Sequence, residues 1–169
     1  MELFLLRHAI AVGRGTEGYL GDADARRPLT AEGLKKMTEA ARGIQRLGLS
    51  FDEILSSPLP RAWETARVVA RAVREESRLV ECSELMPEAP MNGVLDLLKL
   101  RKDKPSVLLV GHEPGLSQLA LHLVSAGSGP CLEFKKGGLA KIELEFLRGQ
   151  PHGCLAWLVT PKILRCLGG

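Results

Sequence analysis

Short apolar runs alternate along this chain with stretches in which apolar residues recur at helical spacing. The run at residues 3–6 has four apolar residues in succession, which suits a strand buried on both faces of a parallel sheet. Residues 107–110 give the strongest strand signal for the same reason. Alternation over residues 139–146 instead predicts a strand with one exposed face. Further strands are expected at residues 51–55, 79–80 and 155–159.

Four helices are expected between these strands. The first begins after Thr30, whose hydroxyl can cap a helix, and stops at Gly48. The second has prolines suited to its first turn, with Ser57 as its candidate cap. The third covers residues 94–100, and the fourth begins near Leu116. The sequence 127–130 is expected to end the fourth helix, and residues 148–153 and the segment from 161 onward are expected to be a turn and a tail.

The repeated order of strand and helix predicts one α/β domain over residues 1–169. We expect a three-layer α/β/α sandwich around a mostly parallel six-stranded sheet. The short link between the last two strands implies an antiparallel hairpin, which places an antiparallel edge at the C-terminal end of the chain. A long loop over residues 10–29 interrupts this order, and it leaves the first strand where it could border a pocket.

Composition excludes several classes of protein. A net charge of +3 is too weak, and its cations too scattered, to predict nucleic-acid binding. The longest apolar runs are too short to cross a membrane, and the first residues do not resemble a signal peptide. Four widely spaced cysteines lack metal-binding spacing, so we expect free thiols in a cytoplasmic protein. They are Cys82, Cys131, Cys154 and Cys166.

Polar groups stand at three of the predicted strand ends. Arg7 and His8 follow the first strand, Arg61 opens the helix after the second, and His112 follows the strand at 107–110. An isolated Arg-His pair is equally well explained as a strand that merely ends in polar residues. Three such ends can converge at the carboxyl edge of a sheet, where open α/β folds bind ligands. We read His122 and His152, which lie off any such end, as surface residues.

Two arginines and two histidines at one edge indicate an anion site, most simply for phosphate. The planar guanidinium matches the spacing of phosphate oxygens, and a cation in the first turn of a helix becomes favourable when an anion binds there. No P-loop or acidic cluster is present to hold magnesium, which argues against kinase-like chemistry. His8 could itself be the nucleophile, since histidine forms covalent intermediates.

Four ordered motifs carry a resemblance to the histidine phosphatase superfamily, which has the phosphoglycerate-mutase-like fold. They are Leu6-Arg7-His8-Ala9, Arg27-Pro28-Leu29-Thr30 with Gly33, Ser56-Ser57-Pro58-Leu59-Pro60-Arg61-Ala62 with Thr65-Ala66, and Gly111-His112-Glu113-Pro114. More narrowly, the chain resembles the SixA-type phosphohistidine phosphatases. Ala9 departs from the superfamily, in which glycine usually follows the Arg-His pair.

The resemblance implies that His8 attacks phosphorus, while Arg7, Arg61 and His112 hold the phosphoryl oxygens. Larger relatives have an acidic proton donor in mid-chain, and here Glu84, ahead of Glu88, is the candidate. We therefore expect a metal-independent, cofactor-free, monomeric phosphatase that acts on phosphohistidine in a protein, such as a phosphotransfer domain. The alternatives are a phosphatase of small phosphoesters or phosphoanhydrides and a phosphate-binding module without turnover.

Overall fold

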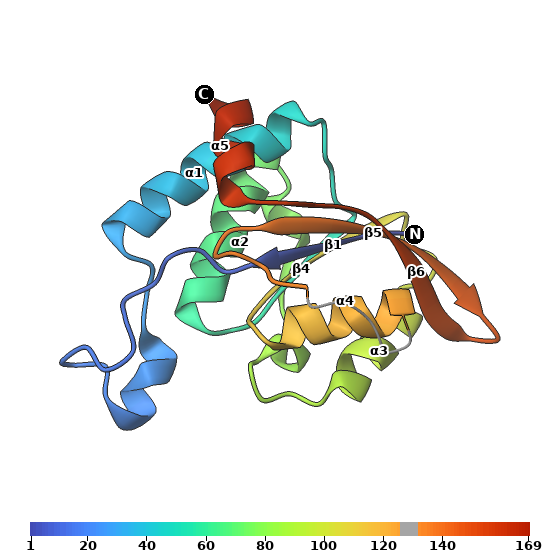
Figure 1. Ribbon diagram of the computed structural model, residues 1–169, viewed down its shortest axis with the longest axis horizontal. Helices are drawn as coiled ribbons and strands as arrows, with labels where there is room; N and C mark the ends of the chain where they lie inside the picture. The colour runs from blue at the N-terminus through green and yellow to red at the C-terminus, as the bar shows by residue number, and fades with distance from the viewer. Residues whose placement is uncertain (126–131) are drawn as a thin grey trace.

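The computed structural model describes residues 1–125 and 132–169, which form one six-stranded sheet with helices on both faces (Figure 1). The strands are β1 (Glu2–Arg7), β2 (Glu53–Ser56), β3 (Leu79–Glu81), β4 (Ser106–Gly111), β5 (Leu139–Leu147) and β6 (Gln150–Val159). The α-helices are α1 (Ala31–Arg46), α2 (Pro60–Val73), α3 (Met91–Lys99), α4 (Gly115–Ser125) and α5 (Pro161–Gly168). Three short 3₁₀ helices are η1 (Gly21–Arg26), η2 (Glu76–Arg78) and η3 (Ser83–Leu85).

The order of strands across the sheet is β3-β2-β4-β1-β5-β6. The first four of these strands are mutually parallel, and β5 and β6 add an antiparallel edge. The predicted α/β fold with its antiparallel C-terminal edge is thus confirmed. In the parallel part, β1 lies beside β4 with Arg7 opposite Gly111, so the residues that follow both strands emerge together.

Alternate residues of β1 enter two separate cores. Phe4 and Leu6 pack in the core that α1, α2 and α5 cover, whereas Leu3 and Leu5 pack in the core beneath α3 and α4. All four side chains are fully buried. The apolar run at residues 3–6 therefore marks a strand with two buried faces, as its pattern predicts.

The first helix has the boundaries that the sequence predicts. The Thr30 hydroxyl accepts a hydrogen bond from the Gly33 N–H at 2.9 Å, which satisfies one of the free donors at the start of α1. Beyond the last turn, Gly48 has a φ of +69°, a left-handed conformation that glycine adopts without steric cost.

The segment from residue 161 onward was expected to be a tail, and that prediction is wrong, because it forms α5. The Thr160 hydroxyl caps this helix and Pro161 stands in its first turn. Leu164 is fully buried against the core of α1 and α2. A Cβ on Gly43 of α1 would lie 2.0 Å from the Leu164 carbonyl oxygen, so a glycine there lets the two helices approach closely. One buried leucine in so short a segment gives little periodicity to detect.

The turn expected at residues 148–153 is also shorter than predicted. β6 already begins at Gln150, and His152 lies exposed on this strand opposite Glu145. Pro151 fits because β6 is an edge strand, where a residue without an N–H is tolerated.

His122 was expected at the surface, but it is half-buried on α4. Among the described residues, no helix has the length and apolar character needed to span a membrane.

Candidate active site

His8 lies directly after β1, in a position that fixes which of its ring nitrogens carries hydrogen. The backbone N–H of His8 donates a hydrogen bond to the Gly111 carbonyl at 3.0 Å, and the residue is 8% exposed. The ring Nδ1 lies 2.7 Å from the Ala9 carbonyl oxygen. A carbonyl can only accept a hydrogen bond, so Nδ1 must carry the hydrogen and Nε2 keeps its lone pair. This is the tautomer that a nucleophilic Nε2 requires.

The surroundings of His8 also keep its ring neutral. Burial lowers its pKa to about 4, opposed in part by the hydrogen bond to Ala9 and reinforced by the charges of Arg61 and Arg7. A cationic ring would have no lone pair for attack on phosphorus. Burial, with a smaller contribution from the same positive charges that would attract a phosphoryl group, therefore keeps His8 in its reactive neutral form.

His112 is brought beside His8 by the pairing of β4 with β1. The two ring centroids lie 5.1 Å apart, and His112 is 5% exposed. Burial lowers the pKa of His112 to about 3, with further contributions from His8 and Arg61, so this ring is neutral as well. Its Nε2 lies 2.9 Å from the hydroxyl oxygen of Ser57, at the end of β2.

Ser57 does not serve as the cap that the sequence predicted for α2. The helix begins at Pro60 with Leu59 at the N-cap position and no side-chain cap. The Ser57 hydroxyl accepts a weak bond from the Leu59 N–H at 3.4 Å and contacts His112 instead. This contact depends on tertiary structure, because the pairing of β4 with β2 brings the His112 imidazole within reach of the Ser57 hydroxyl.

Arg61 occupies the first turn of α2, as predicted, and is only 3% exposed. Burial, followed by the charge of Arg27, lowers its pKa. Thr65, one turn later, joins this arginine to the residue after His8. Its hydroxyl donates to the Arg61 carbonyl at 2.7 Å and accepts from the Ala9 N–H at 3.0 Å. No role for Thr65 is predicted from the sequence, although its four-residue spacing from Arg61 places the two residues on one face of the helix.

Arg7 reaches the site from the end of β1 and is held by the backbone of Phe134. Its Nη1 donates to the Phe134 carbonyl at 2.5 Å, and the Phe134 N–H donates to the Glu113 carboxylate at 3.0 Å. The Arg7 Nε is buried and has no hydrogen-bond partner within the described residues. A buried donor without a partner is costly, so this atom is available for an oxygen of a bound anion. The roles of Glu113 and Phe134 could not be predicted from the sequence, because their contact joins segments that are 21 residues apart.

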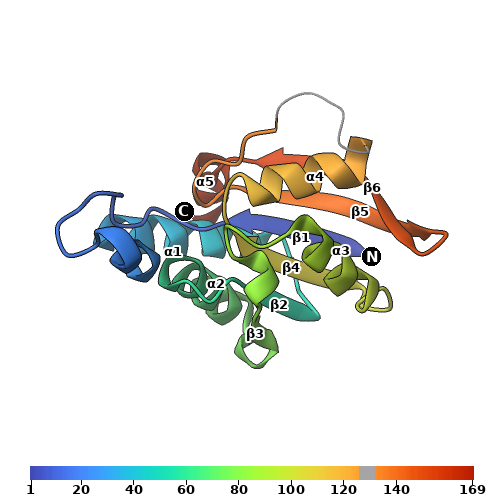
Figure 2. The same ribbon diagram turned by 90° about the horizontal axis from the view of Figure 1, so that it is seen from below.

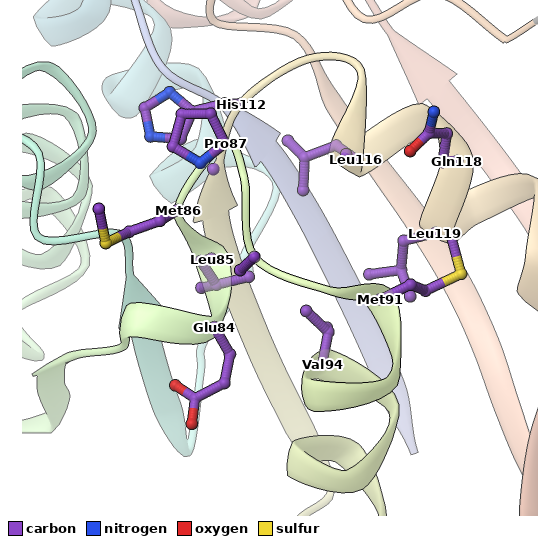
Figure 3. Close-up of a pocket in the computed structure, with 13 residues that line it drawn as sticks. Glu84, Leu85, Met86, Pro87, Met91, Val94, His112, Leu116, Gln118 and Leu119 are labelled. Carbon is purple, nitrogen blue, oxygen red and sulfur yellow. The ribbon is translucent and has the colours of Figure 1, made fainter. Parts of the chain in front are cut away.

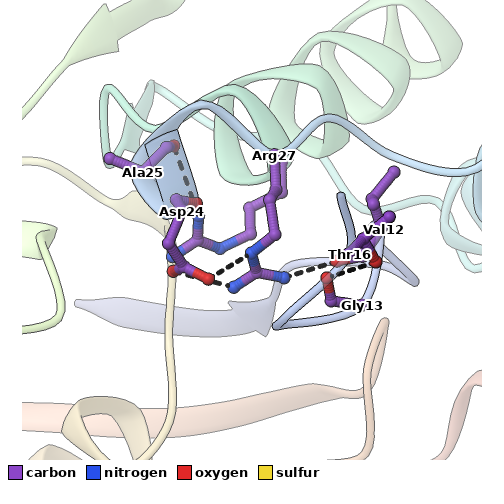
Figure 4. A network of polar contacts seen from close by, with 7 residues as sticks. Val12, Gly13, Thr16, Asp24, Ala25 and Arg27 are labelled. Carbon is purple, nitrogen blue, oxygen red and sulfur yellow. Dashed lines mark hydrogen bonds and ion pairs between the residues drawn. The ribbon is translucent and has the colours of Figure 1, made fainter. Parts of the chain in front are cut away.

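The long loop at residues 10–29 borders the site, as the sequence suggested. The Nη1 of Arg61 faces the carbonyl oxygens of Asp24 and Ala25, at 3.5 and 3.4 Å. Arg27, 6% exposed, pairs with the Asp24 carboxylate at 2.7 Å and donates to the Val12 carbonyl at 2.5 Å (Figure 4). This network ties both halves of the loop together beside Arg61.

Glu84 does not join the cluster of histidines and arginines. Both it and His112 line a cavity of about 70 Å³, but the Glu84 carboxylate is directed away from the His112 ring (Figure 3). It accepts hydrogen bonds from the Cys82 thiol and the Ser83 hydroxyl, each at 3.2 Å. The Glu84 pKa is lowered, first by its own backbone N–H and then by Cys82. Glu84 is thus an ionised, half-buried carboxylate here, while Glu88 is exposed.

Other chemically reactive groups lie apart from this cluster. Cys82 is buried, and burial raises its pKa to about 12, whereas Cys154 and Cys166 are exposed free thiols. Cys131 and the predicted helix end at 127–130 lie outside the described residues. Across residues 1–125 and 132–169, no three His, Cys, Asp or Glu side chains are grouped so as to hold a metal ion.

The sequence of this chain is similar to a family model and to other proteins. The family model described as the histidine phosphatase superfamily (branch 1) matches residues 3–85, which contain Arg7, His8 and Arg61. An uncharacterised protein from Picosynechococcus sp. is 35% identical over 168 residues, covering 97% of this chain and 99% of the relative.

Two solved structures have the same fold. One is the protein histidine phosphatase SixA complexed with tungstate, at 24% identity and a TM-score of 0.83, with 97% of this chain and 99% of that chain covered. The other is a phosphoserine phosphatase mutant from Entamoeba histolytica in complex with phosphoserine, at 17% identity and a TM-score of 0.65, with 95% and 98% covered. These likenesses establish the architecture around the site.

Proposed function

This chain belongs to the histidine phosphatase superfamily, and from that premise we propose that it is a metal-independent phosphatase acting on phosphohistidine in proteins. The observation that carries the proposal is the state of His8. Its Nδ1–H is donated to the Ala9 carbonyl and its ring is neutral, so Nε2 is free to attack. The similarity in fold to a protein histidine phosphatase supports the choice of substrate.

In the first step, the Nε2 lone pair of His8 attacks phosphorus and forms a P–N bond. The P–N bond of the substrate breaks, and its electron pair goes to the leaving imidazole. The phosphorylated ring of His8 is now cationic, because Nδ1 still carries its hydrogen. The Ala9 carbonyl, 2.7 Å from Nδ1, is placed to stabilise that charge.

In the second step, water attacks the same phosphorus and releases inorganic phosphate. The P–N electron pair returns to Nε2, and the water proton passes to solvent, which regenerates neutral His8. In both steps negative charge on the phosphoryl oxygens would be met by Arg61 and by the buried Nε of Arg7. His112 is neutral, so it contributes a hydrogen-bond donor rather than a full charge.

The leaving group argues for a P–N substrate. An alkoxide needs a proton donor in the transition state, whereas phosphohistidine leaves as imidazole, whose conjugate acid has a pKa of about 6.5. The Glu84 carboxylate is ionised and directed away from His112, which makes it a poor donor. Protonation by solvent suffices for imidazole but not for an alkoxide.

A second candidate function is hydrolysis of small phosphoesters or phosphoanhydrides. The fold shared with a phosphoserine phosphatase favours it. A phosphate-binding module without turnover is less well supported, because Arg7, His8, Arg61 and His112 are all present.

A substrate panel tests the proposal. The purified chain is given a phosphohistidine-bearing protein, phosphoimidazole, phosphoserine and an alkyl phosphate, with and without EDTA. The proposal requires the highest kcat/KM for the phosphohistidine protein, loss of turnover in His8→Ala, and no effect of EDTA. Faster cleavage of phosphoserine or alkyl phosphate would favour the second candidate, and turnover of none of them would favour the binding module.

A further inference from the structure

A groove between α1 and α2 lies on the outer surface of the layer that these helices form. They lie side by side on one face of the sheet (Figure 1 and Figure 2), and the groove encloses about 760 Å³. None of Arg7, His8, Arg61 and His112 lines it. It is therefore a surface that the proposed chemistry leaves without a role.

The groove has apolar residues along its length. Leu34 of α1 is 47% exposed, although its neighbours in the apolar stripe are buried. Val68 and Ala72 of α2 are partly buried and lie across from it in the same groove. Together they offer apolar contact area from both helices to an inserted side chain.

The sides of the groove are basic. Arg42 of α1 and both Arg67 and Arg71 of α2 line it and are exposed. Within the part of the chain that the structure describes, none of the three makes an ion pair or a side-chain hydrogen bond. The sole acidic residue of the lining, Glu64, accepts the Leu29 N–H at 2.8 Å. Three free guanidinium groups around an apolar strip are complementary to an acidic, amphipathic partner.

One end of the groove lies close to the candidate active site. Leu29 and Thr30 line that end, and Leu29 pairs with Ala11, three residues beyond His8. Glu64 is one helical turn after Arg61. From Glu64 to Arg71 the axis of α2 rises about 10 Å, which is about two turns of a bound helix. A segment bound there would begin within about one turn of Arg61.

We propose that this α1–α2 groove docks an acidic amphipathic helix of the protein that carries the phosphohistidine. The inference rests on the proposed function and deepens it. It explains how the enzyme would prefer a phosphorylated protein to a small molecule, such as phosphoimidazole, that carries only the reacting group. The apolar stripe of the helix would contact Leu34 and Val68. Its flanking carboxylates would pair with the three arginines, the usual arrangement of a helix bound in a groove.

Charge reversal separates docking from chemistry. The variant Arg42→Glu/Arg67→Glu/Arg71→Glu is compared with a matched control, Lys102→Glu/Lys104→Glu/Arg148→Glu. The control makes the same change in charge at exposed positions away from the groove. Both are assayed on a chemically phosphorylated phosphotransfer domain with acidic helices and on phosphoimidazole. Turnover of phosphoimidazole also reports that each variant is folded.

The groove variant should lose about 10-fold or more in kcat/KM on the protein, mainly through KM, because steering by charge typically changes association by 10-fold to 1,000-fold. Its activity on phosphoimidazole should be unchanged, and the control should match the wild type on both substrates. High salt should reduce the advantage of the wild type.

Each contrary result has a distinct meaning. Equal kcat/KM for the wild type and the groove variant on the protein would overturn the docking proposal alone. An equal loss in the control would do the same, because it would show an effect of net charge. A wild type that hydrolyses neither substrate would overturn the proposed function, and the docking proposal with it.

Discussion

Acidification should leave His8 neutral, and therefore nucleophilic, far below the pH at which an ordinary histidine becomes charged. Burial, reinforced by Arg61 and Arg7, lowers the pKa of His8 to about 4. At pH 5.5 a histidine with a pKa of about 6.5 is about 9% neutral, whereas one with a pKa of about 4 is about 97% neutral. The amount of reactive enzyme at this pH thus differs about tenfold between the two cases.

Long-range proton–nitrogen NMR correlation of the imidazole rings measures this directly. The His8 signals, assigned with a His8→Asn variant, should report a neutral ring with hydrogen on Nδ1 from pH 7 down to about 5. Over the same pH range, the rate at which the phosphoryl-enzyme forms in a single turnover should not fall through protonation of His8. A titration midpoint near 6.5, or hydrogen on Nε2, would refute both the reading of the Ala9 contact and the nucleophile derived from it.

The same lowered pKa predicts how stability depends on pH. His8 binds a proton less readily in the folded state than in the unfolded state. Its contribution to the free energy of unfolding is therefore fully present above about pH 6.5 and is lost as the pH falls toward 4. The difference between 6.5 and about 4 corresponds to about 3 kcal/mol at full loss. His112, with a pKa of about 3, acts in the same direction. Urea unfolding at pH 7 and pH 4.5 should show a larger loss in the wild type than in His8→Asn, and equal losses would contradict the burial argument.

Four further outcomes test other parts of the site and fold. Arg61→Lys should lower kcat by about 100-fold, the scale for a lost transition-state donor, and near-normal kinetics would show that Arg61 is only a helix-start residue. Thr65→Val removes the hydroxyl that links the Ala9 N–H to the Arg61 carbonyl, so kcat should fall while the circular dichroism spectrum is retained. An effect confined to KM would argue against this positioning role. Glu84→Gln should leave turnover of both phosphohistidine and an alkyl phosphate unchanged, since the carboxylate is directed away from His112, and a selective loss on the alkyl phosphate would restore Glu84 as proton donor. Leu164→Ala should lower the free energy of unfolding by about 2–5 kcal/mol in urea titration, because a buried leucine leaves a cavity; a change below about 1 kcal/mol would mean that α5 is not part of the core.

Local pattern was enough to predict the sheet and the strand ends that carry the candidate site. Runs such as 3–6 and 107–110 are apolar at every position because both faces of their strands are buried, and few structures other than a central parallel strand need this. Once these strands are parallel neighbours, His8 and His112 must emerge at the same edge. The position of Arg61 in a first helical turn is equally local, since Pro60 fixes where that helix begins.

Other features of the site depend on contacts between segments that are distant in the sequence. The Ser57 hydroxyl has the chemistry of a helix cap, and only the approach of β4 turns it toward His112. The depressed pKa of His8 arises from burial by several elements, which no single stretch of sequence encodes. Glu84 follows β3 and lines a cavity with His112, yet its carboxylate accepts a hydrogen bond from the Cys82 thiol and is directed away from the His112 ring.

The same division applies to the surface. Arg42 lies on α1, and Arg67 and Arg71 lie on α2, so the three exposed side chains belong to two separate helices. Packing of α1 against α2 makes them the sides of one groove beside the candidate site. Amphipathic periodicity determines which face of a helix is buried, but the crossing of two helices determines which exposed side chains become neighbours.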